Sequence, residues 1–261
     1  MANQSLTYRF KTANIVLKLI VINAIIFIGT GIAAVLTGTK AISLEKWFVL
    51  PHDLLDFLGQ PWSLITYSFL HNDIWHIGIN MLMLYWFGGF VLNLFSEKRF
   101  LAIYLLGAIA GGTFFLFINY VFPLTDPRPV VGASGAVMAI MVFMAAYAPH
   151  TEVRILRWNL KLWHIVAFFV VWDLVKFPTS GNAGGLLVHF GGALFGYFYA
   201  RQLLKGKDIG SWFESFMDGV PNLFKTRKAK PFKKVHRNKT TQSQSQRSKE
   251  KVGKSDHQKR I

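Results

Sequence analysis

Six long apolar runs limit what this chain can fold into. They cover residues 14–37, 73–95, 100–122, 131–148, 162–177 and 184–204. About 20 apolar residues in a helix cross about 30 Å of hydrocarbon, so each run is a candidate transmembrane helix. The fourth and fifth runs are short. The helix that each forms therefore either tilts little or has one end below the membrane surface in a protein-lined cavity. The sequence therefore predicts an all-α membrane protein with a bundle of six transmembrane helices.

The composition excludes several other classes of protein. The chain has no cysteine, which rules out a disulfide scaffold, a thiol nucleophile and any Cys-ligated metal. A hydrophobic content of 52%, with 24 Phe, excludes a wholly disordered chain. The net charge of +16 would suit a soluble nucleic-acid binder, but the hydrophobicity does not, and we expect no nucleic-acid partner.

The positive charge is concentrated at the C-terminal end. Residues 225–261 carry a net +12 of the total +16. We therefore predict a membrane domain over 1–205, an amphipathic segment at the membrane interface over 206–224, and a basic, disordered cytoplasmic tail over 225–261. The interfacial stripe would consist of Trp212, Phe216, Val220 and Phe224, although Gly219 and Pro221 weaken a helix there. The tail either binds anionic lipid headgroups or only enforces topology.

The short connections set the orientation. One side of the predicted bundle carries most of the basic residues, namely Arg9, Lys11, Lys98, Arg99, Arg154, Arg157, Lys161, Arg201, Lys205 and Lys207. By the positive-inside rule, both termini are cytoplasmic. We expect an integral multi-pass protein of a bacterial inner membrane. On the opposite side, the loop 38–72 is rich in large apolar residues, including Trp47 and Trp62, which predicts that this loop lies in the membrane interface.

Four polar residues stand out because polar groups are expensive inside a membrane. They are His76 and Asn80 in the second run, Ser134 in the fourth and His189 in the sixth. In the predicted topology these three helices all begin at the outer face, and each polar residue lies within about 10 Å of its helix start. His76 and Asn80 also share one helix face. Three helices thus place polar side chains at a similar depth.

Small residues should bring the serine and a histidine together. Gly132, Gly135 and the Gly192/Gly196 pair would let the fourth and sixth helices approach closely. A serine hydroxyl needs a neighbouring base to become a nucleophile, and histidine can take the proton and return it to the leaving amine. The backbone N–H of Ser134, with His76 and Asn80, could bind the oxyanion.

Each of these residues also has a plain structural interpretation, as a packing serine or as an interhelical hydrogen-bonding residue. The shared depth and face favour catalysis over packing. No acid lies beside His189 in sequence, so the pattern indicates a Ser-His dyad. Asp173 is a possible distant contributor, although a membrane-edge residue paired with Lys176 is the favoured interpretation.

At these positions the chain resembles the rhomboid family of intramembrane serine proteases. The resemblance rests on ordered strings that together cover roughly residues 14–204: Pro61-Trp62, then Phe69-Leu70-His71 with His76 and Asn80, then Gly132-Ala133-Ser134-Gly135, then His189-Phe190-Gly191-Gly192 with Gly196. One string alone is modestly specific. All of them in order, with this topology, are strongly specific.

The resemblance implies a six-helix bundle with a water-filled cavity open to the outside. It implies that Ser134 is the nucleophile, that His189 is the general base, and that His76, Asn80 and Ser134 contribute to the oxyanion hole. It implies a structural role for His71, and no metal, nucleotide or other cofactor. The substrates it implies are membrane-anchored proteins, cleaved in or near a transmembrane helix.

Two positions near the site depart from the family pattern. Ser63 stands where many members have arginine, and Met138 where many have an aromatic residue that packs on the histidine. A methionine sulfur can still pack against an imidazole. Ser134 and His189 are both present, which argues against the family's inactive relatives. The rival interpretations are a silent scaffold that binds transmembrane helices, and a transporter, which the lack of repeat symmetry disfavours.

Overall fold

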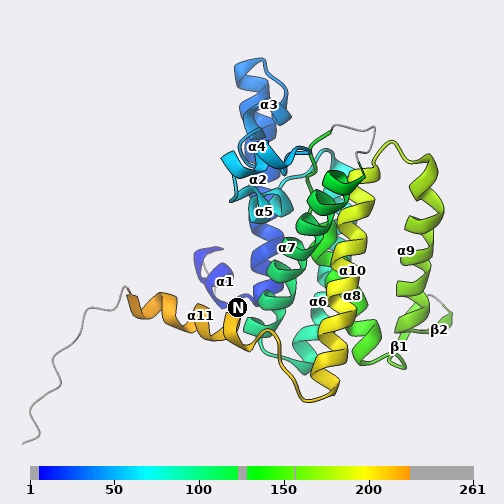
Figure 1. Ribbon diagram of the computed structural model, residues 1–261. Helices are drawn as coiled ribbons and strands as arrows, with labels where there is room; N and C mark the ends of the chain where they lie inside the picture. Colours follow the sequence, from blue (N-terminus) through cyan, green and yellow to red (C-terminus); the bar gives the residue numbers. More distant parts are fainter. Residues whose placement is uncertain (1–5, 123–127, 156, 224–261) are drawn as a thin grey trace, which may run out of the picture. The chain divides into compact units, whose positions relative to one another are not determined.

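The computed structural model describes residues 6–122, 128–155 and 157–223 (Figure 1). These residues belong to one unit, Met1–Pro221, apart from the last two residues of the final helix, which open a second unit, Asn222–Ile261. The predicted basic tail, 225–261, lies outside the described residues, and so does Phe224 of the predicted stripe. The predicted domain boundaries therefore stay predictions.

Five helices among the described residues are long and apolar enough to cross a membrane. They are α2 (Ile15–Thr37), α6 (Ile74–Leu94), α7 (Glu97–Val121), α9 (Leu162–Lys176) with the 3-10 turn η2 (Phe177–Thr179), and α10 (Ala183–Leu204). An all-α membrane protein is confirmed. The count of six spanning helices is not, because the fourth predicted helix forms only as α8 (Ser134–Tyr147), which has 14 residues.

Helix α8 is about 21 Å long at 1.5 Å per residue, well short of the hydrocarbon thickness. It begins at residue 134 rather than 131 because the backbone before it is irregular. Val130 pairs with Leu50 in an antiparallel bridge, and Gly132 has a φ of 129°. Residues 130–133 are buried although they are not helical. The protein therefore surrounds this backbone, as irregular backbone at membrane depth requires.

Polar side chains define where the long helices begin. Asn14 accepts a hydrogen bond from a backbone N–H in the first turn of α2, and Asp73, Ser96 and Asn182 do the same for α6, α7 and α10. Each cap satisfies N–H groups that have no partner within their own helix. The capping residues therefore fix the starts of the two helices, α6 and α10, that carry the predicted histidines.

Helix α8 is the centre of the bundle. Nine of its 14 residues are buried, and it packs against α6, α7 and α10. The closest approach is to α10, where Gly192 lies on the backbone of Gly135 and Gly196 on that of Ala139. A Cβ atom added at either α10 glycine would overlap a carbonyl oxygen of α8. The prediction that small residues bring these two helices together is confirmed.

Hydrogen bonds attach the loop between α2 and α6 to this core. It contains α3 (Ala41–Glu45), α4 (Leu54–Gly59), α5 (Ser63–Thr66) and the 3-10 turn η1 (Tyr67–Phe69). The indole N–H of Trp62 donates to the carbonyl of Trp47 at 2.7 Å, and the Leu50–Val130 bridge joins the loop to the segment before α8. Trp47 and Trp62 are both about half exposed. A position in the membrane interface stays a prediction.

Three short elements complete the described part of the chain. Helix α1 (Leu6–Thr12) precedes α2, and β1 (Glu152–Ile155) pairs antiparallel with β2 (Trp158–Lys161) in a hairpin that sequence reasoning missed. Helix α11 (Ser211–Leu223) continues through Gly219 and Pro221. Arg99 in the first turn of α7 forms ion pairs with Asp208 and with Glu214 of α11, and these pairs hold α11 at this end of the bundle (Figure 1).

The contact between α8 and α10 yields a stability prediction. We expect Gly192→Ala to lower the free energy of unfolding by about 1–3 kcal/mol, because its Cβ would overlap the carbonyl oxygen of Gly135. Gly89→Ala in α6 is the matched control. No atom lies within 4 Å of a Cβ at that position, so the change should be neutral or stabilising. Thermal unfolding in detergent tests the pair, and equal unfolding temperatures would contradict the expectation.

Candidate active site

Ser134 is the first residue of α8, and the chain before it is held in an unusual conformation. The first hydrogen bond within the helix runs from the N–H of Val137 to the carbonyl of Ala133, so the N–H of Ser134 comes before the helical ladder begins. The N–H of Gly132 donates to the carbonyl of Tyr67 at 2.9 Å. The positive φ of Gly132 strains any residue with a side chain. Ser134 is half-buried, while Ala133 and Gly135 are buried.

His76 lies beside the serine. A Cβ atom at Gly132 would be 2.6 Å from Nε2 of His76 and 3.5 Å from Oγ of Ser134, so both side chains border the bare face of this glycine. Asp73 caps α6 by accepting from the N–H of His76 at 2.9 Å. One turn further, the buried Asn80 donates through Nδ2 to the carbonyl of His76 at 2.9 Å. The structure therefore brings His76 and Ser134 together at Gly132, with Asn80 one turn further along α6.

His189 lies where α10 crosses the start of α8. Its neighbour Val188 and its i+3 neighbour Gly192 both contact Gly135, the residue after Ser134. His189 is half-buried, directly after the buried Val188. The predicted base is thus brought to the same end of α8 as the predicted nucleophile.

The favoured interpretation of Asp173 was wrong. Its carboxylate Oδ2 lies 2.7 Å from Nδ1 of His189, and the residue is only 8% exposed. Lys176, the expected partner, has its ammonium 4.8 Å from the centroid of the Trp172 ring. Packing of α9 against α10 brings together two residues 16 positions apart, a pairing that local spacing does not reveal. The predicted Ser-His dyad therefore did not include the contact between Asp173 and His189.

His71 packs on the site from the loop. Its ring meets that of His76 edge to face, with centroids 5.0 Å apart, and the residue is 4% exposed. Burial, and secondly the charge of His76, lowers the pKa of His71 to about 4. The His71 ring is therefore neutral at physiological pH and packs against His76 without a charge. This geometry fits the structural role that the resemblance implies.

The other predicted residues lie close to the centre of the bundle. Gly135 contacts Val188, Gly192 contacts Gly135, and Met138 is buried in α8 at 6% exposure. Ser63 is fully buried, and its hydroxyl has no hydrogen-bond partner among the residues that the structure describes. The hydroxyl does not replace the hydrogen bonds that an arginine at this position could donate.

Tyr67 is a residue that sequence reasoning missed. It is fully buried, its hydroxyl donates to the carbonyl of Ala108 in α7 at 2.7 Å, and its own carbonyl accepts from Gly132. It therefore joins the loop, α7 and the start of α8. The one signal in the sequence is its position four residues before His71, which does not distinguish it from other aromatic residues of the loop.

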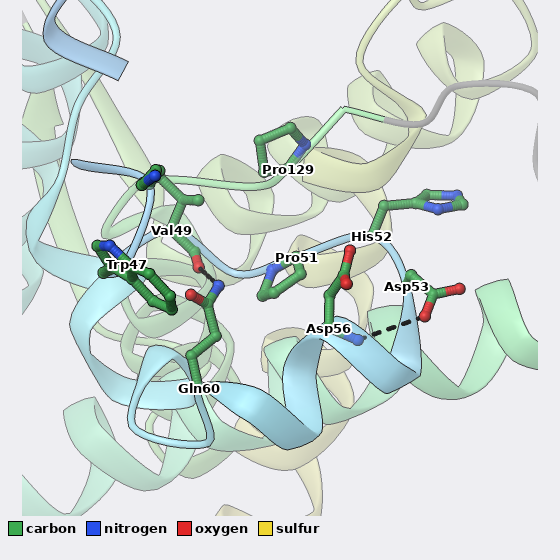
Figure 2. A pocket seen from close by; sticks show the side chains of 9 residues that line it. Trp47, Val49, Pro51, His52, Asp53, Asp56, Gln60 and Pro129 are labelled. Atoms are coloured by element: carbon green, nitrogen blue, oxygen red, sulfur yellow. Dashed lines mark hydrogen bonds between the residues drawn. The ribbon is translucent and has the colours of Figure 1, made fainter. Parts of the chain in front are cut away.

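A separate cavity of about 490 Å³ lies in the loop (Figure 2). It is lined by residues between Lys46 and Gln60 and by Pro129, and Gln60 closes one side by donating to the carbonyl of Val49 at 3.1 Å. Neither Ser134 nor His189 lines this cavity. Because the predicted catalytic residues gather at the start of α8, we place the candidate active site there and not in this cavity.

The fold and the site together define an all-α, multi-pass membrane protein with serine and histidine side chains gathered at the start of a short central helix. The Rhomboid domain matches residues 58–206, more than half of the chain. The chain belongs to the rhomboid family, as the ordered motifs predicted. Protease function is typical of this family.

The similar curated proteins are mitochondrial. The chain is 27% identical to Rhomboid protein 1 of Saccharomyces cerevisiae over 65% of its own length and 51% of the yeast protein. It is 30% identical to RHOMBOID-like protein 12 of Arabidopsis thaliana over 57% of its length and 48% of the plant protein. It is 29% identical to the human Presenilin-associated rhomboid-like protein over 54% of its length and 37% of that protein. The chain thus spans about half or less of these relatives.

Proposed function

We propose that this protein is an intramembrane serine endopeptidase that hydrolyses a peptide bond of membrane-anchored proteins in or near a transmembrane helix. The observation that carries the proposal is the position of His189, which lies where α10 crosses α8 at Gly135, next to Ser134. Both residues are half-buried, so part of each side chain stays accessible to a substrate. Family membership supports the same reaction.

In the proposed reaction, Oγ of Ser134 attacks the scissile carbonyl while Nε2 of His189 takes the hydroxyl proton. The tetrahedral intermediate collapses, the peptide C–N bond breaks, and His189 returns the proton to the leaving nitrogen. Water then attacks the acyl-enzyme with the same histidine as base. The new carboxyl terminus leaves, and Ser134 recovers its proton.

The oxyanion needs donors that are fixed before the reaction starts. We assign this role to the N–H of Ser134 at the start of α8, to the His76 ring and to the amide of Asn80. One Nδ2 hydrogen of Asn80 is used by the carbonyl of His76, which leaves the second hydrogen to donate. His76 borders the same bare face of Gly132 as Oγ of Ser134, which supports the assignment.

The membrane environment is part of the proposal. Five long apolar helices support a multi-pass protein, and we keep the expectation that both termini face the cytoplasm of a bacterial cell. The mitochondrial relatives do not test the bacterial placement. We also propose that anionic lipids bind the basic run after α11. Trp212 and Phe216 of α11 are each 61% exposed on a helix whose Glu214 is held by Arg99.

Labelling by a fluorophosphonate probe in detergent tests the nucleophile. We expect the wild type to be labelled, and Ser134→Ala and His189→Ala to lose both labelling and cleavage of a membrane-anchored substrate. Ser215→Ala and His150→Ala change exposed residues far along the sequence and serve as matched controls. The alternative is a silent scaffold that binds transmembrane helices. Substrate binding that survives in Ser134→Ala, with no labelling of folded wild type, would favour the scaffold.

Kinetics test the oxyanion donors. We expect His76→Ala and Asn80→Ala each to lower kcat by about 100-fold with little change in KM, because the lost donors act mainly on the transition state. Asn93→Ala, at an exposed position of the same helix, is the control. A rise in KM with kcat unchanged would instead mean that these residues bind the substrate.

Limited proteolysis tests the lipid proposal. In nanodiscs with anionic lipid we expect trypsin to cut the basic run more slowly than in neutral nanodiscs. The protection should disappear in about 0.5 M salt, which screens the charges. Equal cutting rates in both lipids would mean that the run only enforces topology.

A further inference from the structure

Asp173 and His189 are joined by a short polar contact between two largely buried side chains. The carboxylate oxygen and Nδ1 are 2.7 Å apart, with the two side chains 12% and 22% exposed. An acidic residue buried in a membrane helix is costly unless it is paired. The hydrogen bond to the imidazole compensates for that cost. A carboxylate in this position also decides which ring nitrogen carries the proton, because it can only accept.

The outer part of α9 presents one buried residue to the bundle. Leu162, Val166 and Asp173 are the buried residues of this helix, and from Val171 to Lys176 every residue except Asp173 is exposed. The apolar contacts of Leu162 and Val166 hold the other end of α9. Near the candidate site, α9 therefore contacts His189 through the polar side chain of Asp173.

We propose that Asp173 is a positioning residue that holds His189 in the tautomer with the proton on Nδ1. This inference rests on the proposed function and extends the predicted dyad. With Nδ1–H donated to Asp173, Nε2 of the neutral ring is left to take the proton of Ser134. When it does so, the imidazolium keeps Nδ1–H bonded to the carboxylate, which itself stays unprotonated. Asp173 acts through His189 and does not touch the substrate.

The groups around His189 agree with this assignment. From α6, Nε2 of His76 borders the bare face of Gly132 beside Ser134. From α9, Asp173 supplies a negative charge, while the nearby Lys176 lies over the Trp172 ring at 4.8 Å. The partner of Nδ1 is the Asp173 carboxylate at 2.7 Å, and because a carboxylate can only accept, Nδ1 is the donor.

The first measurement is the tautomer itself. We would label the histidines of the full-length protein in detergent micelles with ¹⁵N and assign the His189 signals by their loss in His189→Gln. We expect Nδ1 to be protonated and Nε2 to be unprotonated in the wild type. In Asp173→Ala the population with the proton on Nε2 should rise. This measurement needs no enzymatic activity, so it tests the inference even if the protein cleaves nothing.

The second measurement separates positioning from packing. We expect Asp173→Asn to lower kcat by about 10- to 100-fold with KM changed by less than about threefold, since an amide does not enforce the tautomer. Asp173→Glu should recover part of kcat, because it restores a carboxylate. Val166→Ala is the matched control. It removes a buried contact of the same helix and should lower the unfolding temperature while leaving kcat near that of the wild type.

Distinct outcomes overturn the two proposals. A wild-type His189 with its proton mainly on Nε2, or Asp173→Asn with wild-type kcat, would overturn the role of Asp173 and leave the protease assignment intact. A folded wild type that no fluorophosphonate probe labels would overturn the protease assignment, while the tautomer measurement would still decide the role of Asp173. If Asp173→Asn fails to fold, the wild-type tautomer alone decides.

Discussion

The contact of backbone on backbone between α8 and α10 is the constraint on which the rest of the structure depends. Gly192 and Gly196 of α10 lie directly on the carbonyl groups of Gly135 and Ala139 of α8. Without a hydrophobic driving force between helices in lipid, such close packing supplies the association energy. The same contact fixes the site, since Ser134 directly precedes Gly135 and His189 lies about one turn before Gly192. The stability of the bundle and the geometry of the candidate site thus both depend on having glycine at positions 192 and 196.

The loop between α2 and α6 supports this crossing from one end. The Leu50–Val130 bridge and the Tyr67–Gly132 hydrogen bond hold the irregular backbone before α8, so the first turn of that helix starts at a fixed place. His71 contributes a neutral ring that packs on His76. Residues outside the proposed catalytic set therefore determine where the proposed nucleophile, oxyanion donors and base lie.

The sequence predicted what depends on composition and short spacing. Apolar runs gave the long helices to within a few residues, and polar residues inside them gave His76, Asn80, Ser134 and His189. Contacts between distant segments could not be predicted in this way. Asp173 lies 16 residues before His189, and its partner depends on how α9 packs. The late start of α8 likewise depends on a bridge to Leu50, about 80 residues earlier in the chain.

The shortness of α8 has a consequence for how this chain can vary. Each residue inserted between Gly135 and Tyr147 would lengthen the helix by about 1.5 Å and turn one end against the other by about 100°. Because nine of the 14 residues are buried, every insertion would misalign a packed face. Helix α2, with 11% of its most apolar stretch buried, has no such restriction. The length of α8 sets how far Ser134 lies from the other end of this packed helix. We therefore expect the length of α8 to vary far less than that of α2.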